Sequence, residues 1–299
     1  MTVLKAILMG LIQGVAEFLP ISSSGHLVLF KQLFHVNTDT GILFDVMLHL
    51  GTLLAVFVVF RKEIGKLCIE FIKILADIGK NAKIFVQSRF GKKDWGFSEA
   101  PKYHKVIANA YRKFALLILV STIPTAILGY LAKDLVKLAS ENLLVPGIGL
   151  ILTAILLLIA DMVKDQGKTP KQVSYTNGFV IGICQGIATL PGLSRSGTTI
   201  AAALISGFDR KFAVKYSFLM SIPAILGASV LELPKLKGAN IPLTEIAYYG
   251  IGMAVAAVTG YICIKTMLVV VKKKKFLGFS IYCFLVGVAA VVGFMVQQM

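Results

Sequence analysis

Two short segments of the chain combine hydroxyl, glycine and charged side chains in a way that suits phosphate chemistry. The first, residues 13–26, reads QGVAEFLPISSSGH, and the second, residues 185–198, reads QGIATLPGLSRSGT. At a constant offset of 172 residues, a glutamine, an alanine, two glycines and two serines are identical. Each copy begins with mainly apolar residues, is interrupted by a proline and continues with residues that carry hydroxyl groups. A duplicated polar break predicts a binding site between two halves of a membrane protein.

The second segment carries an arginine, Arg195, in an apolar region expected to lie at membrane depth. An ionised group there is costly and marks a functional site, and its planar guanidinium suits phosphate oxygens. A helix predicted over 198–208 points its N-terminus at the break, which favours an anion. The alternative is a structural arginine that caps carbonyl groups of the first break. The expected binding set is Gly192, Ser194, Arg195, Ser196, Gly197, Thr198 and Thr199.

The first segment supplies groups for nucleophilic attack. Glu17 lies one helical turn after Gln13, and His26 lies three and four residues beyond Ser23 and Ser22, within reach of either hydroxyl. A hydroxyl near an imidazole and a carboxylate is the minimum set for nucleophilic catalysis. Ser23 is therefore the candidate nucleophile and Ser22 the second choice, although serine triplets also cap helices. Gln13 and Ser24 are expected to contact the substrate.

A further carboxylate, Asp45, precedes His49 by four residues at the start of an apolar span. Together with Glu17 and the phosphates of a substrate, Asp45 could hold a divalent cation, Mg²⁺ or Ca²⁺. The alternative is that Asp45 caps the start of its helix.

The composition predicts an all-α integral membrane protein. Of the 299 residues, 57% are hydrophobic and 15% are charged, whereas soluble domains carry about 25% charged residues. The net charge of +16 could indicate nucleic acid, but the basic residues cluster between apolar spans, as membrane topology requires. We therefore expect a membrane protein with no nucleic-acid partner.

Six transmembrane helices and two re-entrant helix–loop–helix hairpins are predicted in one membrane domain, residues 1–299. The hairpins are expected because each of their arms is too short to cross a bilayer at about 1.5 Å per residue. The two halves, 1–163 and 173–299, are predicted to form an inverted-topology repeat. The hairpins are placed at 1–36 and 174–208, and the spans at 41–60, 114–133, 144–162, 211–231, 246–270 and 277–297.

The basic residues also predict sidedness. Loops on one face hold 23 Lys and Arg residues, and loops on the other hold 5, so the basic face is expected to be cytoplasmic and both termini outside. The long cytoplasmic loop, 61–113, contains an amphipathic stretch over 64–85 that predicts a helix in the membrane interface; a docking surface for a partner is the alternative. The basic loops are 61–113, 163–173, 209–215 and 271–276, and the opposite loops are 31–40, 132–143 and 232–245.

Three segments resemble the bacterial undecaprenyl-diphosphate phosphatases, or bacitracin-resistance proteins. Residues 13–26 resemble that family's (E/Q)-x-x-x-E segment and serine motif, PGLSRSG at 191–197 resembles P-G-x-S-R-S-G, and FDVMLHLGT at 44–52 resembles a third shared stretch. The resemblance covers the whole chain. Gln13 stands where some members have glutamate. A neutral amide cannot act as a base and is a weaker cation ligand, so these roles are expected to fall mainly to Glu17. The family's functional positions carry over as Glu17, Ser22, Ser23, His26, Arg195 and Thr199.

The resemblance implies that the protein removes the terminal phosphate of undecaprenyl diphosphate, with a divalent cation, in the bacterial inner membrane. It thereby implies recycling of the lipid carrier for cell-wall polymers, at a site expected to open to the outer face. On this reading Arg195 holds the phosphate, Ser23 attacks and His26 moves the proton, although direct attack by water, with the serines only binding phosphate, fits the sequence nearly as well. Because inverted repeats are typical of transporters, a polyprenyl-phosphate flippase or anion transporter is the alternative. A homodimer is left open.

Overall fold

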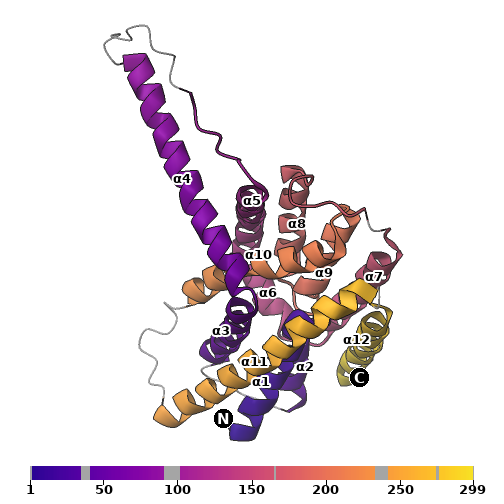
Figure 1. Cartoon of the computed structure of the whole chain (residues 1–299). Helices are drawn as coiled ribbons and strands as arrows, with labels where there is room; N and C mark the ends of the chain where they lie inside the picture. Colours follow the sequence, from indigo (N-terminus) through magenta and orange to yellow (C-terminus); the bar gives the residue numbers. More distant parts are fainter. Residues whose placement is uncertain are drawn as a thin grey trace.

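The computed structural model describes residues 2–34, 41–90, 102–164, 166–232, 242–273 and 276–298, and the elements in these ranges are helices apart from one isolated bridge between Lys168 and Phe208 (Figure 1). The predicted all-α class is therefore confirmed. The elements are α1 (Val3–Phe18), α2 (Ser23–Leu33), α3 (Gly41–Val59), α4 (Arg61–Phe90), α5 (Ala110–Leu131), α6 (Lys133–Ala139), α7 (Leu144–Met162), α8 (Tyr175–Ile187), α9 (Arg195–Ile205), α10 (Arg210–Glu232), α11 (Leu243–Val270), the 3-10 turn η2 (Val271–Lys273) and α12 (Leu277–Gln298).

Five helices in the described ranges are long and apolar enough to cross a membrane: α5, α7, α10, α11 and α12. A sixth candidate is α3, which bends by 85° into α4. These six helices coincide with the six predicted spans to within a few residues at each end. The chain is therefore a multi-pass membrane protein.

The four helices of the two predicted hairpins are short, with 16 and 11 residues in α1 and α2 and 13 and 11 in α8 and α9. At about 1.5 Å per residue, none reaches across the ~30 Å hydrocarbon core. The first break follows from Pro20, because a residue before proline avoids the helical conformation, and Leu19 is indeed extended (φ −73°, ψ 140°).

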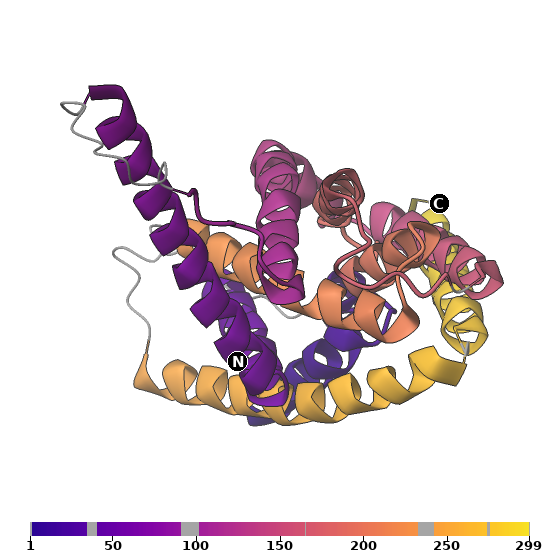
Figure 2. The same cartoon turned by 45° about the horizontal axis from the view of Figure 1, so that its top comes forward.

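The helices of the two halves pack reciprocally. α1 lies along α11 and α8 lies along α5, so the first helix of each half packs against a long helix of the other half (Figure 2). α7 packs against α12, which joins the corresponding last spans of the two halves. This arrangement is what a structural repeat would produce. The inverted orientation of the halves and their boundaries stay predictions.

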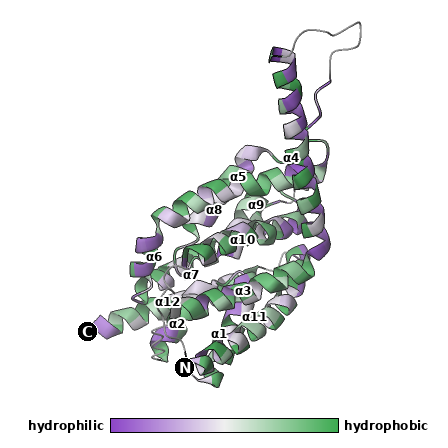
Figure 3. Ribbon diagram, turned by 90° about the vertical axis from the view of Figure 1, so that its left-hand side faces the viewer, coloured by the Kyte–Doolittle hydropathy of each residue, from purple (hydrophilic) through white to green (hydrophobic). Residues whose placement is uncertain are grey.

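Helix α4 covers the predicted amphipathic stretch and extends away from the body of helices (Figure 3). It is tied to the start of α5 by Arg112, whose guanidinium donates to Glu70 Oε2 at 2.9 Å and to Asp77 Oδ2 at 2.6 Å. The Glu70 carboxylate also accepts from Lys73 and Asn109. The location of α4 in the membrane interface stays a prediction.

Sidedness also stays a prediction, because parts of the counted loops lie outside the described residues. These parts are 35–40, 91–101, Asp165, 233–241 with Lys235 and Lys237, and Lys274 and Lys275.

We predict that acid loosens α4. Hydrogen bonds from Lys73, Asn109 and Arg112 lower the pKa of Glu70 to about 2. In the unfolded chain the pKa of a glutamate is about 4.3. Because the pKa of Glu70 is lower in the folded protein, its carboxylate stabilises this junction fully at a pH above about 4.3, and the stabilisation is lost as the pH falls toward 2. Amide hydrogen exchange along α4 should therefore be faster at about pH 3 than at about pH 7, after correction for intrinsic rates.

The variant Arg112→Gln should show the faster exchange already at neutral pH, whereas the exposed control Lys83→Gln should not. Equal protection of α4 in Arg112→Gln and in the unchanged protein would contradict this account of the junction.

Candidate active site

The two helix breaks, one between α1 and α2 and the other between α8 and α9, approach each other so closely that their backbones are in contact. A Cβ atom added at Gly25 would lie 2.8 Å from the Cα of Gly192, and one added at Gly197 would lie 3.2 Å from the Pro20 side chain. Gly192 itself has φ +87°, and a Cβ there would lie 2.0 Å from the Pro146 carbonyl oxygen. Glycine is needed at Gly192 both for its left-handed backbone and for the close approach of α7.

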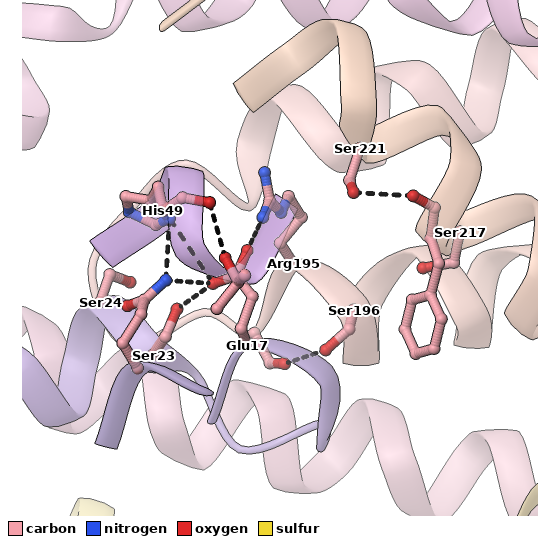
Figure 4. A network of polar contacts seen from close by, with 12 residues as sticks. Glu17, Ser23, Ser24, His49, Arg195, Ser196, Ser217 and Ser221 are labelled. Atoms are coloured by element: carbon pink, nitrogen blue, oxygen red, sulfur yellow. Dashed lines mark hydrogen bonds and ion pairs between the residues drawn. The ribbon is translucent and has the colours of Figure 1, made fainter. Parts of the chain in front are cut away.

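The Glu17 carboxylate is the centre of the site (Figure 4). Its Oε1 pairs with the Arg195 guanidinium, and its Oε2 accepts from the Ser23 hydroxyl at 2.7 Å and from Gln13 Nε2 at 3.0 Å. The Glu17 side chain is only 3% exposed, whereas Arg195 is 23% exposed. The structure thus brings the predicted carboxylate, hydroxyl and guanidinium together from both breaks.

Ser23 and Arg195 are both the first residue of the helix that follows a break. Each helix is capped by the preceding serine: the Ser22 hydroxyl accepts from Gly25 N at 3.2 Å, and the Ser194 hydroxyl accepts from Gly197 N at 3.1 Å. Ser22 adopts φ +70°, a strained conformation for a residue with a side chain. Its hydroxyl accepts the capping hydrogen bond, whereas the Ser23 hydroxyl donates to a carboxylate, which favours Ser23 as the candidate nucleophile.

His26 does not bond to a serine hydroxyl in the structure, which corrects the expected contact. Its Nδ1 lies 2.8 Å from the Ser22 carbonyl oxygen, and its Nε2 lies 2.8 Å from the Tyr282 hydroxyl. Because a carbonyl oxygen only accepts, Nδ1 donates and Nε2 accepts from Tyr282. One helical turn places a side chain over the backbone of the residue four earlier, so the ring reaches the carbonyl of Ser22.

A different histidine lies beside the carboxylate. His49 Nδ1 is 3.8 Å from Glu17 Oε2 and 2.9 Å from Gln13 Nε2. The sequence singled out His49 only because it lies four residues after Asp45. The packing of α3 against α1, which places His49 beside Glu17, could not be predicted from the residues around it.

Asp45, predicted as a metal ligand, forms an ion pair with Lys31 at 2.6 Å. The described residues contain no group of three or more His, Cys, Asp or Glu side chains placed to hold a metal ion. One buried oxygen near Glu17 does lack a hydrogen-bond partner among the described residues: Gln13 Oε1. An amide oxygen is a ligand type that hard cations accept. Because Gln13 turns Nε2 rather than Oε1 toward Glu17, a cation shared by the two side chains requires the amide to turn over.

The remaining predicted residues surround Arg195. Thr199 donates to the Arg195 carbonyl oxygen at 2.8 Å and lies 2.6 Å from the Ser217 hydroxyl. The Ser196 hydroxyl lies 3.5 Å from the Leu19 carbonyl oxygen of the first break. Thr198 Oγ1 is buried without a partner among the described residues. The hydroxyl groups of Ser194 and Ser24 contact other hydroxyls of their own segments, at 3.4 Å to Ser196 and to Ser22 respectively.

Three residues that sequence reasoning missed support the second break. Thr153 on α7 accepts from Ser194 N at 2.8 Å and lies 3.1 Å from the Gly192 carbonyl oxygen. Ser217 and Ser221 on α10 line a cavity of about 10 Å³ together with Glu17 and Arg195, a volume that suits about one water molecule. Hydroxyls inside apolar spans were the available signal, but serine and threonine also bond locally to the helix backbone.

We predict strong coupling between Glu17 and Arg195. Removing one partner of a buried ion pair leaves an uncompensated charge and costs about 3–5 kcal/mol, whereas removing both does not. In thermal or denaturant unfolding of the protein in detergent, Glu17→Gln and Arg195→Met should each lower stability. The double variant should lose less than the sum, with a coupling of about 0.5–3 kcal/mol. Ser140→Ala is the control, and additive losses would contradict the pairing.

The fold and the site together define an all-α, multi-pass membrane protein whose polar centre, built from two helix breaks, suits an anionic substrate. Residues 6–289 match the bacitracin resistance protein BacA family. Proteins named undecaprenyl-diphosphatase are similar over nearly their whole length. The relative from Halothermothrix orenii is 36% identical over 98% of both chains, that from Methanosphaera stadtmanae 36% over 97% of both, and that from Christiangramia forsetii 36% over 98% of both. The chain therefore belongs to the BacA family.

Proposed function

We infer that the protein hydrolyses undecaprenyl diphosphate to undecaprenyl phosphate and inorganic phosphate. The observation that carries this inference is the contact of Ser23 and Arg195 with one carboxylate, Glu17, in a chain whose full-length relatives carry the name of this activity. The site therefore contains a nucleophile, an acceptor for its proton and a fork of donors for phosphate.

Arg195 is proposed to exchange partners when the substrate binds. In the structure its guanidinium is held by Glu17, and a terminal phosphate offers oxygens of the same geometry with more negative charge. Transfer of Arg195 to the phosphate leaves the Glu17 carboxylate free to accept a proton. The N-terminus of α9, which begins at Arg195, adds a favourable field for the anion.

Ser23 then attacks. Its hydroxyl already donates to Glu17 at 2.7 Å, so the proton passes to Glu17 as Ser23 Oγ bonds to the terminal phosphorus and the bond to the bridging oxygen breaks. Undecaprenyl phosphate leaves, and water hydrolyses the phosphoserine to release phosphate. His26, which is bonded to Tyr282, is proposed to orient the Ser22 backbone rather than to move this proton.

A divalent cation fits the same centre. We propose that Glu17 and the unpartnered Gln13 Oε1 contribute to its shell with phosphate oxygens of the substrate, because Mg²⁺ in such sites is bound by one or two carboxylates and phosphates. The cation would neutralise charge on the phosphates. Asp45, paired with Lys31, is left outside this set.

The orientation of the protein is proposed from its charge distribution. The excess of Lys and Arg in the loops at 61–113, 163–173, 209–215 and 271–276 supports a cytoplasmic location for that face. Both termini and the mouth of the first break then face outside the inner membrane, which is where a phosphatase would meet the released lipid carrier.

We predict that Ser23→Ala and Arg195→Lys nearly abolish phosphate release from undecaprenyl diphosphate. The first removes the nucleophile, and the second keeps the charge but loses the bidentate fork. Each should lower kcat/KM by about a hundredfold or more, in the range that follows loss of a group used in the transition state, while Ser140→Ala stays near the unchanged protein. Full activity in Ser23→Ala would contradict attack by Ser23 and favour direct attack by water.

A chelator should remove activity, and Gln13→Glu should lower the Mg²⁺ or Ca²⁺ concentration that restores half of it, because a carboxylate binds a hard cation more strongly than an amide. Without the cation, the new charge would repel Glu17. The thermal midpoint of Gln13→Glu should therefore rise more with added cation than that of the unchanged protein or of Gln13→Met. The same cation response in all three proteins would exclude Gln13 from the cation site.

A further inference from the structure

A large apolar groove opens beside the catalytic centre, between the end of α11 and the start of α12. Its volume is about 860 Å³, which is within the range of about 300–1,000 Å³ for ligand sites. Helix α1 and the first break contribute Val15 and Ile21 to its lining. The lining includes Val15, Ile21, Val270, Gly278, Phe279 and Tyr282.

Two residues that line the groove adjoin the residues of the polar site. Ile21 directly precedes the Ser22–Ser23 pair, and the Tyr282 hydroxyl bonds to His26 Nε2 at 2.8 Å. The rings of Tyr282 and His26 stack with their centroids 5.5 Å apart. The tyrosine therefore turns its one polar atom toward the site while its ring lines the groove.

We propose that this groove binds the isoprenoid chain of the diphosphate substrate, in the segment next to the headgroup. This inference rests on the proposed function, because it takes the diphosphate to lie at Glu17 and Arg195. The chain is covalently joined to the diphosphate and must leave the polar centre through an apolar passage. The small cavity beside Arg195, about 10 Å³, cannot hold it, whereas the groove starts within two residues of the nucleophile.

Gly278 offers a clean way to test the groove. It lies in the lining, and a Cβ atom added there would meet no atom within 4 Å. The first carbon of a larger side chain at this position therefore has open space in the lining of the groove and displaces no protein atom. Gly250 on α11 is the matched control, since it is exposed, has the same open surroundings and does not line the groove.

The experiment measures phosphate release from undecaprenyl diphosphate in detergent micelles for the series Gly278→Ala, Gly278→Leu and Gly278→Phe and for Gly250→Phe. KM should rise with side-chain size, by about tenfold for Gly278→Phe, with kcat within about twofold. Burial of each lost CH₂ contributes about 0.8 kcal/mol, so two displaced groups suffice. Gly250→Phe should keep the unchanged KM. A KM that stays constant through the Gly278 series would overturn the proposal.

A second measurement does not depend on catalysis or on those variants. A polyprenyl diphosphate analogue with a photoreactive group on its first isoprene units should crosslink to the peptide containing residues 277–282, and undecaprenyl diphosphate should compete while phospholipid should not. Crosslinking elsewhere, or equal competition by phospholipid, would show that the groove holds bulk lipid. If the unchanged protein releases no phosphate but crosslinks here, the proposed function fails while the binding site stands.

Discussion

The ion pair between Glu17 and Arg195 constrains the rest of the molecule. A carboxylate that is 3% exposed within a membrane protein must be paired, since an isolated charge in such surroundings is strongly unfavourable. Its partner is 178 residues away in the sequence, so the pair forms only if the two helix breaks touch. Gly25 and Gly192 permit that contact, because a side chain at Gly25 would strike the other backbone. Charge and backbone shape thus impose the same geometry.

The sequence duplication explains how one carboxylate collects two different partners. Ser23 and Arg195 occupy equivalent positions at the offset of 172 residues, and each begins the helix after its break. Glu17 corresponds to Thr189, whose hydroxyl donates to the nearby Gly186 carbonyl oxygen at 2.7 Å. The helix start after each break is therefore alike in the two copies, while the proposed chemistry is divided: the first copy would provide the carboxylate and the nucleophile, and the second would provide the guanidinium that binds phosphate.

Apolar runs, prolines and duplicated motifs were sufficient to predict the all-α class, the six spans and the convergence of Glu17, Ser23 and Arg195. Contacts that depend on packing between distant helices were not predictable. His26 was placed by sequence spacing near the serine hydroxyls, yet its ring bonds to a backbone carbonyl and to Tyr282 on α12. His49 reaches Glu17 only because of where α3 lies. Asp45 was a plausible ligand until Lys31, from the preceding helix, was seen to neutralise it.

The charge balance of the site explains why several groups must act together. Glu17 and Arg195 neutralise each other in the structure, so this pair by itself offers an arriving diphosphate no net positive charge. When the guanidinium turns to the phosphate, the carboxylate would face an anion at short range, which is costly where water is scarce. On the proposed mechanism, two processes would relieve that repulsion: binding of a divalent cation, and transfer of the Ser23 proton, whose hydroxyl already donates to Glu17. On this proposal, the second process would neutralise the carboxylate in the same step that creates the nucleophile, so substrate binding itself would drive the activation of Ser23.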